Sequence, residues 1–86
     1  MSETQIVWTD YMHYRLELRG FDLSTVEHIV LYSLERYVDT ATGRFVAVGR
    51  HDTRLVAIPY ERTKSTITPV TIHATSRQQI NFRIKT

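Results

Sequence analysis

The residues best suited to chemistry lie close together near the C-terminal end of the sequence. His73 precedes Thr75 by two residues and Arg77 by four. A histidine titrates near neutral pH and can move a proton, whereas the planar guanidinium of arginine binds phosphate or carboxylate through paired hydrogen bonds. These residue types are suited to acid–base chemistry on an anionic substrate, with His73 moving the proton and Arg77 holding the anion.

The segment that carries these residues is expected to be a strand that leads into a capped turn. Residues 67–75 are predicted to form the strand, in which His73 lies on the face opposite Ile72 because strand side chains alternate. Ser76 then precedes Gln79 by three residues, which is the spacing of a helix-capping box. The histidine and the arginine would thus gather at one end of a sheet.

The tail after this cap fits two structures. Ile80, Phe82 and Ile84 alternate as in a strand, but Ile80 and Ile84 are also one helical turn apart. The cap favours a short C-terminal helix, and an extended tail is the alternative. Either form leaves apolar side chains that a partner strand or helix can cover, and a homo-oligomer is one such arrangement.

A second group of polar residues surrounds the turn predicted near residue 52. If strand 54–60 pairs antiparallel with strand 67–75, Arg54 and Thr75 lie toward the same edge of the sheet. Arg50 and His51 would lie close by and form a second arm of the site. Two plainer interpretations stay open: an exposed turn here, and a surface histidine at position 73 that is bonded to a neighbouring threonine.

Two helices are predicted to come first and to form an antiparallel hairpin. The first covers residues 10–19 and the second runs from residue 23 to about 32 or 33, because Gly20 is suited to end the first helix and Asp22 to cap the second. The second helix should bury a stripe at i, i+3 and i+4. The buried face of the first helix is expected to carry Tyr11, Tyr14 and Leu18.

The second half of the chain is predicted to form a four-stranded antiparallel sheet, because short polar spacers separate successive apolar runs. The fold class is therefore α+β, with the helical hairpin packed on the sheet. Apolar residues on both faces of the middle strands indicate that these strands are covered on both sides. The predicted strands are residues 34–38, 44–49, 54–60 and 67–75.

Length and composition limit the alternatives. The 86 residues suffice for one domain, residues 1–86, with little stability in reserve. There is no cysteine, and the four histidines lack metal-ligand spacing, so we expect neither a disulfide nor a metal site, and no cofactor motif occurs. No apolar run approaches the roughly 20 residues that span a bilayer, and signal-peptide features are missing, which favours a cytoplasmic protein.

The net charge of +2 is the sum of an acidic first half and a basic second half. Residues 1–43 carry three basic and seven acidic side chains, whereas residues 44–86 carry eight basic and two acidic ones. Nine of the eleven basic residues are arginines, which match phosphate and carboxylate geometry better than lysine does. The basic half therefore predicts a polyanion or an acidic protein as partner.

The order helix, turn, helix, antiparallel sheet and arginine-bearing tail resembles small RelE-superfamily toxins, particularly the BrnT-like branch. It is also similar to uncharacterised small domains of the same layout. The resemblance spans most of the chain and is carried by five short segments: residues 8–10, 19–21, 39–44, 55–60 and 70–77.

The resemblance implies the toxin of a type II toxin–antitoxin module. Such a toxin is a metal-independent endoribonuclease that a small acidic antitoxin neutralises. By position, Arg77 matches the arginine that follows the family's last strand, and His73 is the candidate acid or base. RNA would be bound by the second arm, which consists of Arg50, His51, Arg54 and Thr75.

A non-enzymatic interaction module is the alternative. Its basic C-terminal half would then dock an acidic protein or a nucleic acid backbone, and binding would weaken steeply with salt. Loss of cleavage on mutation of His73, with binding retained, distinguishes the two.

Overall fold

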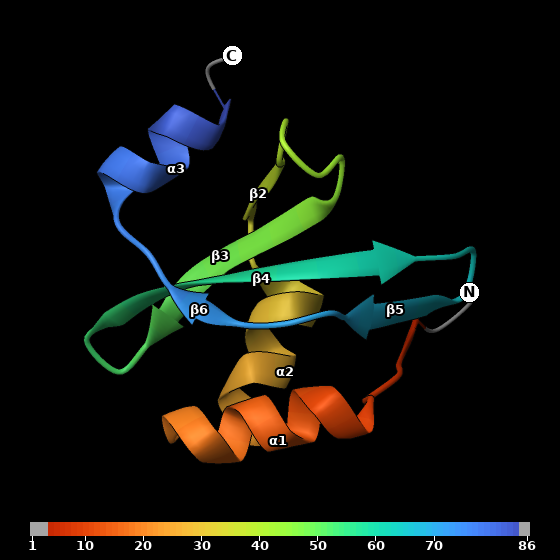
Figure 1. The fold of residues 1–86 in the computed structure, drawn as a ribbon. Coiled ribbons are helices and arrows are strands. Elements are labelled where there is room, and N and C mark those ends of the chain that lie inside the picture. The colour runs from red at the N-terminus through yellow and green to blue at the C-terminus, as the bar shows by residue number, and fades with distance from the viewer. Residues whose placement is uncertain (1–3, 85–86) are drawn as a thin grey trace.

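The computed structural model describes residues 4–84, which form six strands and three helices (Figure 1). The elements follow one another in the order β1 (Gln5–Ile6), α1 (Asp10–Arg19), α2 (Leu23–Tyr32), β2 (Glu35–Val38), β3 (Phe45–His51), β4 (Arg54–Arg62), β5 (Thr66–Pro69), β6 (His73–Ala74) and α3 (Arg77–Ile84). The α+β class is thus confirmed, and the ambiguous tail is helical through residue 84.

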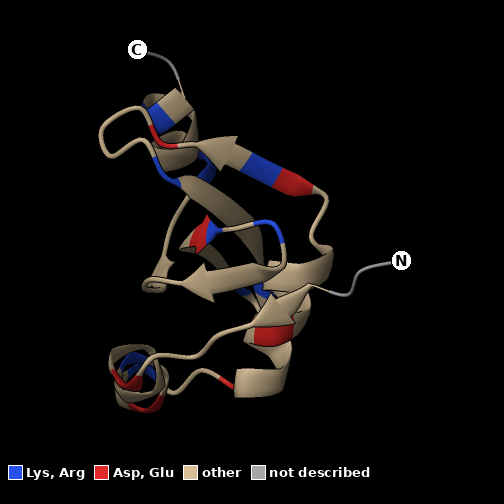
Figure 2. Ribbon diagram, turned by 90° about the vertical axis from the view of Figure 1, so that its right-hand side faces the viewer, with Lys and Arg blue, Asp and Glu red and all other residues tan. Residues whose placement is uncertain are grey.

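The sheet lies between two layers of helix. Helices α1 and α2 cover one face, and α3 lies over the other (Figures 1 and 2). The α1/α2 side buries side chains such as Met12, Val30 and Ile58, while Val48 and Ile80 belong to a second core under α3. The middle strands are therefore covered on both sides, as their composition predicts.

Both predicted helix starts and the glycine stop are confirmed. Thr9 Oγ1 accepts the Met12 N–H at 3.1 Å, and an Asp22 carboxylate oxygen accepts the Thr25 N–H at 3.0 Å. Gly20 ends α1 with φ +71°, a left-handed conformation that glycine adopts without a Cβ clash. Short side chains that accept helical N–H groups thus fix where each helix begins.

The predicted buried face of α1 is wrong. Tyr11, Tyr14 and Leu18 are each more than half exposed, and the helix instead buries Met12 and Leu16, one turn apart. The two helices also cross steeply instead of forming an antiparallel hairpin: α1 lies along the edge of the helical layer while α2 rises behind the sheet (Figures 1 and 2). A helix that crosses its neighbour steeply buries only a narrow stripe of its own surface.

The sheet is mixed, so the prediction of four antiparallel strands is wrong. The strand order is β1-β5-β4-β3-β2, and β6 pairs with β4 beyond the end of β5. The pairs β2–β3, β3–β4 and β4–β5 are antiparallel as expected, but β1 pairs parallel with β5. The predicted strand 67–75 is divided, because residues 70–72 leave the ladder.

A bulge separates β5 from β6. Tyr60 pairs with Pro69 while Ala57 pairs with His73, so two β4 residues oppose three residues of the partner segment. Pro59, which lies in this gap, has no N–H to donate, although its carbonyl accepts the Val70 N–H at 2.8 Å.

The bulge decides which way His73 points. Tyr60 belongs to the core under α1 and α2, whereas Ala57 belongs to the core under α3. In an unbroken register His73 would pair with Val56 and face the α1/α2 core. The extra residue turns His73 to the α3 side instead.

Candidate functional site

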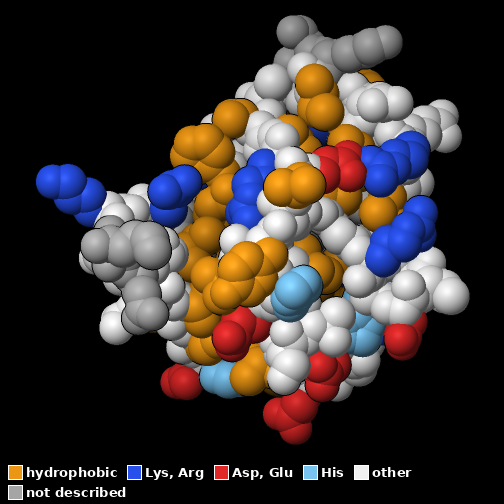
Figure 3. Space-filling view, turned by 180° about the vertical axis from the view of Figure 1, so that it is seen from behind, with side chains coloured by type: hydrophobic (Ala, Val, Ile, Leu, Met, Phe, Trp, Pro, Cys, Tyr) orange, Lys and Arg blue, Asp and Glu red, His pale blue; other side chains and the backbone are white. Residues whose placement is uncertain are grey.

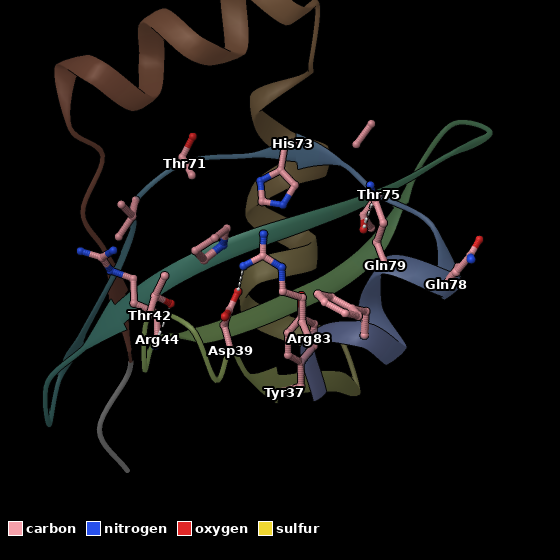
Figure 4. A pocket seen from close by; sticks show the side chains of 14 residues that line it. Tyr37, Asp39, Thr42, Arg44, Thr71, His73, Thr75, Gln78, Gln79 and Arg83 are labelled. Atoms are coloured by element: carbon pink, nitrogen blue, oxygen red, sulfur yellow. Dashed lines mark hydrogen bonds and ion pairs between the residues drawn. The ribbon is translucent and has the colours of Figure 1, made fainter. Parts of the chain in front are cut away.

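A cavity of about 660 Å³ lies on the α3 side of the sheet (Figure 4). It is bounded by α3, the loop between β2 and β3, and the bulged segment that precedes β6. We call it the His73 cavity. Its lining consists of Tyr37, Asp39, Thr42, Arg44, Pro59, Val70, Thr71, His73, Ala74, Thr75, Gln78, Gln79, Phe82 and Arg83.

His73 points into this cavity toward the guanidinium of Arg83 (Figure 4). Desolvation lowers the pKa of His73 below its usual value, and the positive charges of Arg83 and Arg15 lower it further. The carboxylate of Asp39 acts in the opposite direction and raises the His73 pKa. At neutral pH the imidazole is therefore uncharged and has a lone pair that can accept a proton.

Arg83 is held in place by the loop between β2 and β3. Its Nη1 donates to Asp39 Oδ2 at 3.2 Å, and its carbonyl accepts the Thr40 hydroxyl at 2.8 Å. Asp39 is buried and also accepts the Ala41 N–H at 2.8 Å. A carboxylate fixed in this way orients the guanidinium, whose other N–H groups make no hydrogen bond within residues 4–84.

Two further groups of the cavity can act on an anion or a proton. Arg44 directly precedes β3 and is half-buried. Its Nη2 lies 3.4 Å from Glu61 Oε2. Desolvation raises the pKa of the Tyr37 hydroxyl, and the nearby Asp39 charge raises it further. Tyr37 therefore keeps its proton at neutral pH and can donate it.

Arg77 lies outside the His73 cavity. It begins α3 and forms an ion pair with Glu35 of β2. Together with Arg50, Arg54 and Thr75 it lines a separate, shallower hollow of about 400 Å³. The structure thus joins Arg77 to the predicted second arm and not to His73.

His51 does not join either hollow. It is buried, and its Nε2 accepts the backbone N–H of Asp22 at 2.7 Å. Its ring also packs edge-on against Phe21, with 5.1 Å between ring centroids. His51 ties the start of α2 to the turn after β3, so it is a structural residue and we remove it from the candidate site.

The sequence interpretation missed Arg83, Asp39, Arg44 and Tyr37. Arg83 could be found only by choosing a helix for the tail, because it then lies three residues after Ile80 and beside the buried face. The other three lie on or next to the β2–β3 hairpin, whose residues 39–44 were used only for the family resemblance and not as site candidates. Their convergence depends on where α3 returns to the sheet.

Comparisons with protein-family models, with curated proteins and with solved structures find no match. Residues 4–84 contain no helix with the length and apolar character needed to cross a membrane. In the same part of the chain, no three histidine, aspartate or glutamate side chains are arranged to hold a metal ion.

Proposed function

We propose that this protein is a metal-independent endoribonuclease and that the His73 cavity is its active site. The observation that carries the proposal is an uncharged histidine facing a fixed guanidinium inside a concave, partly apolar cavity. RNA supplies both halves of the reaction, because its 2′-hydroxyl lies next to the phosphate that it can attack. Chemistry of this kind needs a base, an acid and positive charge, all of which this cavity contains.

His73 is the base in this proposal. Its neutral imidazole removes the proton of the 2′-hydroxyl, and the 2′-oxygen then forms a bond to phosphorus. The bond from phosphorus to the 5′-oxygen breaks, which leaves a 2′,3′-cyclic phosphate and a free 5′-hydroxyl. Arg83 and Arg44 stabilise the charge that develops on the phosphate oxygens.

Tyr37 is the proton donor to the leaving 5′-oxygen. Since its pKa is raised, it holds its proton at the pH at which His73 is already unprotonated. The acid and the base thus have pKa values displaced in opposite directions, which keeps both in the required form at neutral pH.

The biological setting proposed here is that of a RelE- or BrnT-like toxin in the cytoplasm, neutralised by a small acidic antitoxin. Two observations support it. The basic side chains belong mainly to the sheet and α3, whereas four of the acidic ones lie in or next to α1 and α2. An acidic protein that covers the His73 cavity would therefore be attracted to the catalytic side of the molecule.

The test is cleavage of a defined RNA oligonucleotide in the presence of a metal chelator. We expect His73→Gln to reduce the rate by about 10²–10⁴-fold and Arg83→Ala by about 10²–10³-fold. His28→Gln is the matched control, because His28 is an exposed histidine on α2 outside the cavity. The product of the wild type should carry a 2′,3′-cyclic phosphate.

Two results would contradict the proposed ribonuclease function. No cleavage by the wild type, or equal rates for wild type and His73→Gln, would overturn the proposal. Retained RNA binding without cleavage would indicate the interaction module instead.

A further inference from the structure

The second hollow is built around three arginines. We call it the Arg50 depression; it lies between the β3–β4 turn, the end of β6 and the start of α3. In the view from behind, basic side chains lie across the upper part of the molecule on both sides, while most acidic ones lie below them, toward α1 (Figure 3). The lining consists of Arg50, Thr53, Arg54, Leu55, Ala74, Thr75, Ser76 and Arg77.

The positive charge of the depression is only partly neutralised. Arg50 makes one long contact, 3.4 Å, with the Thr53 carbonyl, and the Arg54 guanidinium lies 4.3 Å from the centre of the Phe21 ring. Arg77 uses Nη1 for its ion pair with Glu35. A guanidinium has five N–H donors, so each of these arginines has donors left to bind an anion.

The depression adjoins the His73 cavity. Ala74 and Thr75 line both hollows, so this short segment of chain separates the two. The backbone of Thr75 is fixed there, because its N–H donates to the Leu55 carbonyl at 2.9 Å. A ligand that passes over Thr75 would reach His73 on one side and the arginines on the other.

We propose that the Arg50 depression binds a second phosphate of the RNA strand, next to the phosphate that is cleaved in the His73 cavity. This inference rests on the proposed ribonuclease function for its choice of ligand. Successive phosphates are a fixed feature of a nucleic acid strand, and arginine binds phosphate bidentately. Oligonucleotides with several phosphates should therefore bind better than a dinucleotide, whose single phosphate fills only one hollow.

Binding can be measured without cleavage. A labelled all-2′-deoxy hexanucleotide has the phosphates but lacks the attacking hydroxyl. We expect Arg50→Ala to weaken its binding by about 5–20-fold and to reduce the slope of log K against log salt by about 0.7, the value for one lost contact with a single strand. Arg62→Ala, an exposed arginine at the far end of β4, is the control of equal charge and should bind as the wild type.

A variant with the opposite effect separates a site from a general charge effect. Glu35→Gln removes the carboxylate that holds Arg77, and it should tighten binding of the hexanucleotide by about 2–5-fold. Equal weakening by Arg50→Ala and Arg62→Ala would overturn the inference. It would also fail if a short polyglutamate peptide, but not the oligonucleotide, depended on Arg50.

Cleavage then distinguishes the two proposals. Lengthening an RNA substrate from one phosphate to five should increase kcat/KM in the wild type, and Arg50→Ala should remove most of that gain through KM. Cleavage with a length dependence unchanged by Arg50→Ala would disprove the second site and leave the ribonuclease function intact. Arg50-dependent binding of the hexanucleotide without any RNA cleavage would support the second phosphate site and disprove the ribonuclease function.

Discussion

Helices α1 and α2 bury a continuous group of apolar side chains on one face of the sheet, whereas α3 covers the other face with Ile80 as its one buried residue among residues 77–84. The ends of α3 are fixed by polar contacts, from Arg77 to Glu35 and from Arg83 to Asp39. The loosely covered side contains the His73 cavity. The proposed active site and the larger apolar core thus lie on opposite faces of the same strands.

Alanine substitutions at one buried residue on each face test this division most strongly. Ile58→Ala should lower the free energy of unfolding by about 2–5 kcal/mol, because Ile58 is fully buried under α1 and α2. Ile80→Ala removes the apolar anchor of α3, so the helix should detach before the sheet unfolds. Denaturant unfolding measures the first effect and amide hydrogen exchange the second.

The difference in packing between the two faces would be disproved if both variants unfolded globally with equal loss of stability. It would also be disproved if Ile80→Ala left the exchange rates of residues 77–84 unchanged. Val38→Ala serves as the control, because Val38 is an exposed apolar residue at the end of β2.

His51 provides a smaller test of the same division. His51→Phe keeps the aromatic contact with Phe21 but leaves the Asp22 N–H without its acceptor. We expect a loss of about 1–3 kcal/mol of stability, the cost of an unsatisfied buried donor. RNA binding per folded molecule should not change; weaker binding at equal stability would restore His51 to the RNA site.

The helix boundaries that depend on local interactions were predicted correctly from the sequence. Caps at Thr9 and Asp22 and the glycine stop at Gly20 need only neighbours within one turn, and both helices begin, and α1 ends, where these residues predict. The face of α1 was mistaken because tyrosines and Leu18 also repeat at helical spacing. Which apolar stripe is buried depends on how α1 crosses the sheet, and spacing alone does not contain that information.

Long-range pairing accounts for the other errors. A two-residue strand such as β1 has no periodicity to detect, and its partners in the parallel strand β5 are 61 residues away. The bulge next to Pro59 could be suspected from the proline, but its effect on His73 depends on the register of β4. The sequence pattern identified His73 as a candidate, whereas Arg83 could be identified only from the way in which α3 packs on the sheet.

Asp39→Asn should have a modest effect that is specific to the α3 side. It removes the carboxylate that occupies Arg83 and that raises the His73 pKa. Anion binding in the His73 cavity should tighten by a few fold, and the acidic limb of the pH–rate profile should move to lower pH. Inorganic phosphate binding and the pH dependence of kcat/KM measure the two effects; a limb that moves to higher pH would contradict the assignment of His73 as the base.

The smallest expected effect is the contribution of His73 to the pH dependence of stability. Its pKa is lower in the folded protein than in the unfolded chain, where it is near 6.5, so the unfolded chain binds more protons as the pH falls through that value. Stability should therefore be complete above about pH 6.5 and decline below it until the folded pKa is reached. His73→Gln should flatten this part of the curve. Because His73 is open to the cavity, the change should be small compared with that of Ile58→Ala, and an equally steep decline in His73→Gln would show that desolvation on the α3 side is too weak to keep the base uncharged.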